Sequence, residues 1–229
     1  MDIKLHYMEK GTGESLILLH GNGENLHYFA HQIDYFAKKY HVIAVDTRGH
    51  GHSPRGTAPF SIRQFAEDLY DFMDERWIEQ ANLLGFSDGG NIALVFALKY
   101  PEKVKNLIID GANLDTDGVK ASVQIPIELG YYTAKLFSGK SRKAKQRAEM
   151  LGLMVNDPKI RPEELESLKV RTLVMAGTRD LIKEEHTKMM AHKIPNARLA
   201  FVEGGHGIAA ENPKTFNRVV EQFLTESES

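Results

Sequence analysis

The sequence predicts an α/β protein with a mostly parallel central sheet and helices on both faces. Short apolar segments alternate with longer amphipathic stretches, a pattern typical of consecutive βαβ units. Two of the short segments, at residues 16–19 and 107–109, are continuously hydrophobic. Uninterrupted apolar runs of this kind indicate strands that are buried on both faces, as in a parallel sheet covered by helices.

The expected elements follow one another along the whole chain. Strands are predicted at residues 3–9, 16–20, 42–46, 81–85, 104–110, 172–176 and 197–202. Helices are predicted at 25–39, 61–76, 89–99, 184–193 and 213–224. Ser61 and Gln64 have the spacing of a capping box at the start of the second helix, and Pro101 ends the third. No internal repeat is present.

One segment, residues 113–165, carries helical patterns and no strand signal. Because it lies between two predicted strands, we expect a small helical cap inserted over the carboxyl edge of a core formed by residues 1–112 and 166–229. Its basic residues indicate a solvated helix face rather than a site for an acidic partner: Lys140, Arg142, Lys143, Lys145 and Arg147. Its apolar residues can face either the core or a pocket: Ile125, Ile127, Leu129, Tyr131, Tyr132, Leu136, Phe137, Met150, Leu151 and Met154.

Length and composition narrow the class of protein. A chain of 229 residues fits one domain with an insertion, and a net charge of −2 gives no reason to expect nucleic acid or an anionic membrane as partner. The chain has no cysteine, which excludes disulfides, thiolate metal sites and a cysteine nucleophile. The first residues lack the features of a signal peptide, and no apolar run approaches the ~18 residues of a membrane span. We therefore expect a soluble, cytoplasmic protein.

The most informative motif is Gly85-Phe86-Ser87-Asp88-Gly89, a G-x-S-x-G sequence between a predicted strand and a predicted helix. In this context the motif indicates a nucleophile elbow, a strained turn that exposes a serine hydroxyl above the sheet. Residues two before and two after the serine must be small to avoid collisions with strand and helix. The alternative is a glycine-rich turn in which Ser87 only caps the helix.

A nucleophilic serine needs a base, and the base needs an orienting carboxylate. Behind such an elbow the partners follow in the order acid, then histidine. We predict His206 as the base, because it lies in a glycine-rich loop after the last predicted strand, whereas most other histidines precede Ser87. We predict Asp180 as the acid, after the strand at 172–176, with Asp110, at the end of the strand at 104–110, as the alternative.

An oxyanion hole requires two fixed hydrogen-bond donors. The predicted donors are the backbone N–H groups of Asp88, which follows the nucleophile, and of Asn22, in the glycine-rich loop after the strand at 16–20. A second loop rich in glycine and histidine, residues 46–53, also follows a strand. We interpret that loop as structural and expect neither a metal site nor a cofactor.

Together these motifs resemble the serine α/β-hydrolase superfamily, and most closely its capped esterase and peptidase-like branch. The resemblance is carried by residues 20–23, 46–53, 85–90, 111–113, 177–180 and 205–206, in the correct order between residues 3 and 224. It implies an eight-stranded type of core with a small helical cap, and cofactor-independent hydrolysis of an ester or related acyl bond in a small-molecule substrate. In an enzyme of this branch, a carboxylate at the place of Asp88 receives the α-amino group of the substrate. Asp88 is thus a candidate substrate contact, although a carboxylate in the first turn of a helix also suits the helix dipole.

The expected function is therefore a carboxylesterase-like serine hydrolase that uses Ser87, Asp180 and His206. The alternatives are an aminopeptidase-like or C–C bond hydrolase with the same three residues, and a ligand-binding receptor with vestigial turnover. Nothing in the sequence indicates the natural substrate or the oligomeric state.

Overall fold

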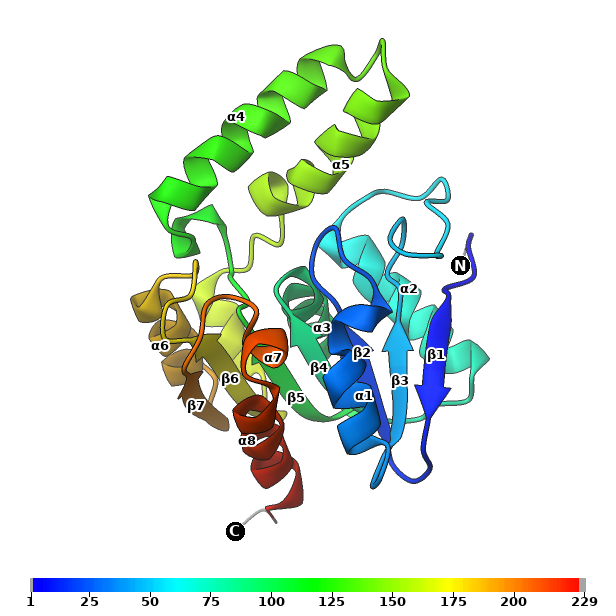
Figure 1. Cartoon of the computed structure of the whole chain (residues 1–229), viewed down its shortest axis with the longest axis vertical. Coiled ribbons are helices and arrows are strands. Elements are labelled where there is room, and N and C mark those ends of the chain that lie inside the picture. Colours follow the sequence, from blue (N-terminus) through cyan, green and yellow to red (C-terminus); the bar gives the residue numbers. More distant parts are fainter. Residues whose placement is uncertain (1, 227–229) are drawn as a thin grey trace.

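The computed structural model describes residues 2–226, which fold around one seven-stranded sheet (Figure 1). The strand order is β1-β3-β2-β4-β5-β6-β7; β2 to β7 are parallel, and β1 is antiparallel to β3. The strands are β1 (Tyr7–Lys10), β2 (Ser15–Leu19), β3 (His41–Val45), β4 (Ala81–Phe86), β5 (Val104–Asp110), β6 (Arg171–Gly177) and β7 (Ala197–Val202). All seven predicted strands are present, and the predicted α/β class is confirmed. Residues 1 and 227–229 of the predicted core lie outside the described residues.

The amino-terminal edge of the sheet differs from the prediction. An eight-stranded type of core was expected, whereas the described residues form seven strands. The predicted strand at residues 3–9 is also too early, since pairing begins at Tyr7. The reason lies in Asp2, whose carboxylate binds the Arg48 side chain and the backbone N–H of Thr57 at 2.6 Å each. These contacts hold the chain before β1 against the loop that follows β3, so it does not lie alongside a strand.

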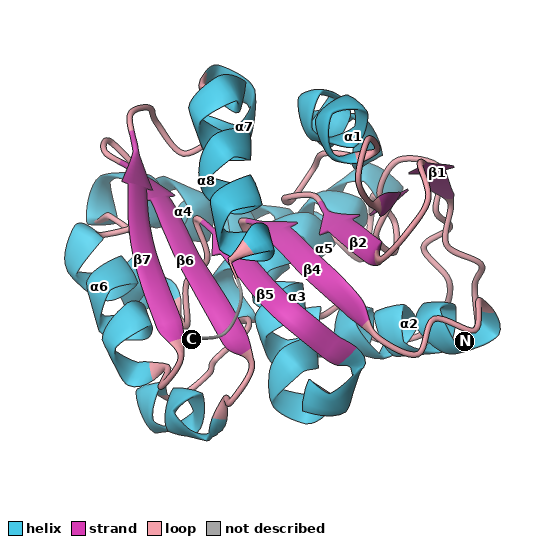
Figure 2. Cartoon of the chain, turned by 90° about the horizontal axis from the view of Figure 1, so that it is seen from below, coloured by secondary structure: helices cyan, strands magenta, loops and turns pink. Residues whose placement is uncertain are grey.

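Helices cover both faces of the sheet, as the sequence predicts (Figure 2). One face packs against α2 (Ile62–Glu75), α3 (Asp88–Lys99) and α6 (Glu184–Lys193), and the other against α1 (Ala30–Phe36), α7 (Ile208–Glu211) and α8 (Pro213–Thr225). The sequence did not predict α7, and the helix predicted at 25–39 is split into the 3-10 turn Leu26–Phe29 and α1. Further 3-10 turns span Pro101–Lys103, Thr116–Gly118 and Pro162–Ser167.

The two faces of β2 show why its sequence is continuously apolar. Leu16 and Leu18 belong to the hydrophobic cluster beneath α1 and α8, whereas Ile17 and Leu19 belong to the cluster beneath α2 and α3. Successive side chains of a strand point to opposite faces, so a strand with helices on both sides needs apolar residues at every position. All four side chains are essentially inaccessible to solvent.

The inserted segment forms a helical hairpin of α4 (Ala121–Phe137) and α5 (Arg142–Asn156), which lies over the carboxyl edge of the sheet (Figure 1). Its apolar residues divide: Tyr131 is buried and Ile127 and Met154 line a pocket. Five others on α4 are exposed: Ile125, Leu129, Tyr132, Leu136 and Phe137. The basic residues at 140–147 are also exposed, as expected of a solvated face. Among the described residues, no helix is long and apolar enough to cross a membrane.

Candidate active site

The turn between β4 and α3 holds Ser87 in a conformation that few side chains adopt, with φ 53° and ψ −120°. The flanking glycines allow it. An added Cβ at Gly85 would collide with the backbone oxygen of Gly89, and one at Gly89 would collide with the backbone oxygen of Leu19. The Ser87 N–H donates to the backbone oxygen of Asp110 at 2.8 Å, which extends the pairing of β4 with β5 to the serine. The turn is therefore fixed on both sides.

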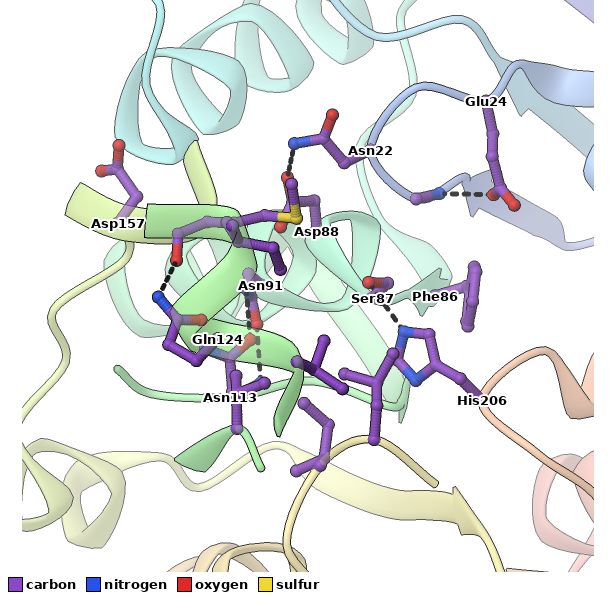
Figure 3. A pocket seen from close by; sticks show the side chains of 17 residues that line it. Asn22, Glu24, Phe86, Ser87, Asp88, Asn91, Asn113, Gln124, Asp157 and His206 are labelled. Atoms are coloured by element: carbon purple, nitrogen blue, oxygen red, sulfur yellow. Dashed lines mark hydrogen bonds between the residues drawn. The ribbon is translucent and has the colours of Figure 1, made fainter. Parts of the chain in front are cut away.

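Three residues predicted from the sequence lie in hydrogen-bond contact at the carboxyl edge of the sheet, and Figure 3 shows two of them, Ser87 and His206. Nε2 of His206 is 3.0 Å from Oγ of Ser87, and Nδ1 of His206 is 2.7 Å from Oδ1 of Asp180. His206 comes from the loop between β7 and α7, and Asp180 from the loop after β6. The distances are those of a hydrogen-bonded serine, base and orienting carboxylate.

Aromatic packing holds the imidazole of His206 in place. The Phe86 ring lies 4.8 Å from the imidazole, between centroids, and the Tyr28 ring stacks on Phe86 at 4.4 Å. The His206 loop also depends on close backbone packing, because an added Cβ at Gly177 would collide with the backbone oxygen of Gly205. A base held in one orientation by its surroundings is ready for proton transfer before substrate arrives.

The two candidate acids have different surroundings. Burial would raise the pKa of Asp180, but the hydrogen bond and charge of His206 and the N–H groups of Ile182 and Gly177 lower it below its usual value. Burial, with the nearby charge of Asp180, raises the pKa of Asp110 well above its usual value. Both carboxyl oxygens of Asp110 are buried, and neither has a hydrogen-bond partner among the described residues. These contacts keep Asp180 ionised at neutral pH, whereas the burial of Asp110 favours its protonated form.

The two residues predicted to supply the oxyanion donors, Asn22 and Asp88, line the same cavity as Ser87. Asp88 is the first residue of α3, and Asn22 lies in the loop after β2. The side-chain amide of Asn22 donates to Oδ2 of Asp88 at 2.9 Å and to the backbone oxygen of Met150 in α5 at 2.8 Å. Asn22 therefore connects the loop, the elbow and the inserted hairpin (Figure 3).

Ser87 and His206 open into a cavity of about 210 Å³ between the sheet edge and the inserted hairpin. Its polar lining includes residues that the sequence analysis missed: Glu24, Asn91, Asn113, Gln124 and Asp157 (Figure 3). Two of these could have been found from their position in the sequence, because Asn91 lies one helical turn after Ser87 and Asn113 follows the end of β5. Their side chains are joined by a hydrogen bond of 3.2 Å from Asn91 Nδ2 to Asn113 Oδ1. For Glu24, Gln124 and Asp157, a single sequence gives no indication that they line the cavity.

The charge of the cavity lining is one-sided. It contains the carboxyl groups of Glu24, Asp88 and Asp157, and its lining has no lysine or arginine. Burial raises the pKa of all three, that of Asp88 to about 6, where the hydrogen bond from Asn22 partly opposes the effect of burial. Three carboxyl groups with raised pKa values in one cavity favour a cationic group there over an anionic one.

Most of the loop at 46–53 has a structural role. The Arg48 guanidinium is fully buried and forms two hydrogen bonds with the Asp68 carboxylate, at 2.6 and 2.7 Å. Nδ1 of His50 is 3.1 Å from the Thr47 hydroxyl. Within residues 2–226, one group of three histidine and aspartate side chains is close enough to hold a metal ion, namely His6, Asp46 and His52, and none of these lines the cavity.

Comparison with known proteins agrees with this architecture. A family model described as the alpha/beta hydrolase fold matches residues 14–139, more than half of the chain. The chain is 30% identical to serine hydrolase BPHL (valacyclovir hydrolase) of Mus musculus, covering 97% of this chain and 83% of that protein. It is 31% identical to a 2-hydroxy-6-oxononadienedioate/2-hydroxy-6-oxononatrienedioate hydrolase of Paraburkholderia phymatum, covering 90% and 69%.

Among solved structures, the enol-lactonase from Burkholderia xenovorans LB400 superimposes with a TM-score of 0.83 at 22% identity, covering 98% of this chain and 97% of that one. At this identity the likeness shows the fold alone. The family model and the relatives at 30% identity or more show the family: the chain belongs to the α/β-hydrolase family and is a hydrolase enzyme of that family.

Proposed function

We propose that the protein is a cofactor-independent serine hydrolase that cleaves a small carboxylic ester or a related acyl bond. The observation that carries the proposal is the continuous contact from Ser87 Oγ through the imidazole of His206 to the Asp180 carboxylate, at 3.0 and 2.7 Å. A serine hydroxyl is a weak nucleophile at neutral pH, and a hydrogen-bonded imidazole supplies the base that it needs.

The proposed reaction has two halves. Oγ of Ser87 attacks the substrate carbonyl while Nε2 of His206 takes the hydroxyl proton, and Asp180 stabilises the resulting imidazolium. The imidazolium then protonates the leaving alkoxide, which departs and leaves an acyl group on Ser87. In the second half a water molecule gives its proton to His206 and attacks the acyl carbonyl. The acid product leaves and the Ser87 hydroxyl is restored.

The negative charge that develops on the carbonyl oxygen needs donors already in place. We assign this role to the backbone N–H groups of Asp88 and Asn22. The N–H of Asp88 is in the first turn of α3, where backbone donors have no carbonyl partner within the helix. The hydrogen bond between the Asn22 and Asp88 side chains supports the assignment, since it keeps both backbones at the mouth of the elbow.

The names of the relatives do not agree on one type of scissile bond. One is named a serine hydrolase, and another is named a hydrolase of 2-hydroxy-6-oxononadienedioate and 2-hydroxy-6-oxononatrienedioate. The small cavity and its acidic lining favour a small ester with a cationic group over the dianionic type of substrate in the second name. A C–C bond hydrolase with the same three residues is therefore the second candidate.

Replacement of the nucleophile tests the proposal directly. Ser87→Ala should lower kcat for p-nitrophenyl esters by roughly 10⁶, because the bond to the acyl group can no longer form. A fluorophosphonate should label Ser87 and no other residue, as read by peptide mass spectrometry. Ser138→Ala, at a partly exposed serine in the turn of the inserted hairpin, is the control and should keep full activity and labelling. An active Ser87→Ala variant, or a label at another residue, would contradict the assignment.

The choice of acid can be tested with two matched variants. Asp180→Asn should lower kcat/KM on the order of 10⁴, because the imidazole loses its tautomer and orientation. Asp110→Asn should change it by less than about tenfold, since burial already favours the neutral form of the carboxyl group that the amide replaces. Denaturant unfolding of both variants checks the fold. If Asp110→Asn proved the more damaging to catalysis, the acid would be Asp110.

A third test concerns Asp88 as a substrate contact. An ester of valine should react at least tenfold faster than the same ester without its amino group at pH 7, where Asp88 is mainly ionised and can bind the α-ammonium group, which is still mainly protonated. The ratio of the two kcat/KM values should fall as the pH falls through about 6, because protonation removes the charge of Asp88. A pH effect on the chemical step that both esters share cancels in the ratio.

The matched variant for this test is Asp88→Asn, which keeps the backbone N–H and an acceptor for Asn22. It should bring the ratio near one at every pH and leave the ester without an amino group little changed. A ratio near one in the unmodified protein would show that Asp88 serves only the helix end.

A further inference from the structure

His6, Asp46 and His52 lie together at the edge of the sheet, away from the lining of the cavity. Asp46 follows β3, His6 immediately precedes β1, and His52 lies in the loop after β3. Oδ2 of Asp46 is 2.8 Å from Nδ1 of His6 and 3.8 Å from Nδ1 of His52, and the three ligand atoms lie within 4.8 Å of one another. The two imidazole rings are 4.8 Å apart between centroids.

Backbone hydrogen bonds fix these three residues relative to one another. The Asp46 N–H donates to the backbone oxygen of His6 at 2.9 Å, and the His52 N–H donates to Oδ2 of Asp46 at 2.8 Å. The His6 N–H donates to Oγ of Ser53, whose hydroxyl donates to the backbone oxygen of Asp46. Gly51 completes the loop, because a side chain there would collide with the Asp46 carboxylate. The side chains are therefore brought together by the fold and not by chance rotamers.

The donor set has the character of a transition-metal site. Two neutral imidazoles and one carboxylate are the ligands that Zn²⁺ takes in three-ligand sites, with a fourth position left to solvent. Bond lengths of about 2.0–2.2 Å in a tetrahedral arrangement place ligand atoms roughly 3.3 Å apart. The distances from Oδ2 of Asp46 to Nδ1 of His6 and of His52, 2.8 and 3.8 Å, lie on either side of this value. Small side-chain rotations can bring both distances to it.

Accessibility also fits this role. The side chains of His6 and His52 are 45% and 79% exposed, whereas that of Asp46 is 1% exposed. An ion can therefore approach from solvent and meet a carboxylate that is already fixed: its other oxygen, Oδ1, accepts the N–H of Leu26 at 2.8 Å.

We propose that His6, Asp46 and His52 form a binding site for Zn²⁺ or a similar divalent transition-metal ion, separate from the site around Ser87. Nδ1 of each histidine and Oδ2 of Asp46 bind the ion, and each imidazole keeps its proton on Nε2. The ion joins the start of β1 to the loop after β3. Through Oδ1 of Asp46 it also steadies the turn at Leu26, which follows the loop that carries Asn22.

The test is titration of ZnCl₂ into protein without an affinity tag, followed by isothermal calorimetry and by the visible spectrum with Co²⁺. The protein should bind one ion per chain. His52→Ala is the decisive variant, because the exposed His52 ring accepts or donates no hydrogen bond in the described structure, so its removal leaves the fold intact. His52→Ala and His6→Ala should each weaken binding on the order of a hundredfold or more.

Two control variants separate this site from other histidines. His192→Ala, at an exposed position of α6 near the opposite edge of the sheet, and His206→Ala should bind zinc as the unmodified protein does. Zinc at a hundredfold above Kd should raise the Tm of the unmodified protein by roughly 5 °C and leave that of His52→Ala unchanged. Absence of saturable binding, binding that survives His52→Ala, or binding that His206→Ala abolishes would each overturn the proposal.

Discussion

The close approach of α3 to β2 is the constraint on which the site depends. An added Cβ at Gly89 would collide with the backbone oxygens of Leu19 and His20, so the helix reaches the end of β2 only because this residue is glycine. That contact places the elbow next to the loop that carries Asn22, while the hydrogen bond from Ser87 N–H to Asp110 ties it to β5. The turn at Ser87 therefore lies between the loop that carries Asn22 and β5, the strand that precedes the inserted hairpin. Strain at Ser87 is sustained because the packing around it permits no relaxed alternative.

The carboxyl groups around this turn are chemically alike and differ in what they contact. Asp180 has three hydrogen-bond donors, including His206, which favour its ionised form, whereas Asp110 has none among the described residues and its burial favours the protonated form. Asp88 has one donor, the Asn22 amide, and burial raises its pKa to about 6. A single negative charge beside the imidazole is what the proposed mechanism needs, because a second one would bind the imidazolium proton too tightly for release to the leaving group. The different protonation behaviour of these three carboxyl groups thus follows from their contacts and not from their residue type.

The sequence predicted the parts of the molecule that local patterns determine. Short apolar segments located all seven strands, the first of them too early, and glycines at fixed offsets located the turn at Ser87. Local patterns could not predict the arrangement before β1, which depends on contacts of Asp2 with residues far along the chain. Local patterns also could not predict which face of α4 is buried. This helix has apolar residues on more than one face, so its tertiary packing decides which of them is covered. The loop at 46–53 illustrates the same limit, since His52 meets His6 only after β1 pairs with β3.

The central claim, that Ser87 carries the acyl group during turnover, is tested most directly by catching that intermediate. The protein is mixed rapidly with p-nitrophenyl acetate, quenched with acid within the first turnover, and digested for peptide mass spectrometry. If Ser87 carries the acyl group, we expect a burst of one p-nitrophenolate per active chain, together with one acetyl group on the peptide that contains Ser87. Release of p-nitrophenolate through many turnovers with Ser87 unmodified at every quench time, and with no burst, would contradict it.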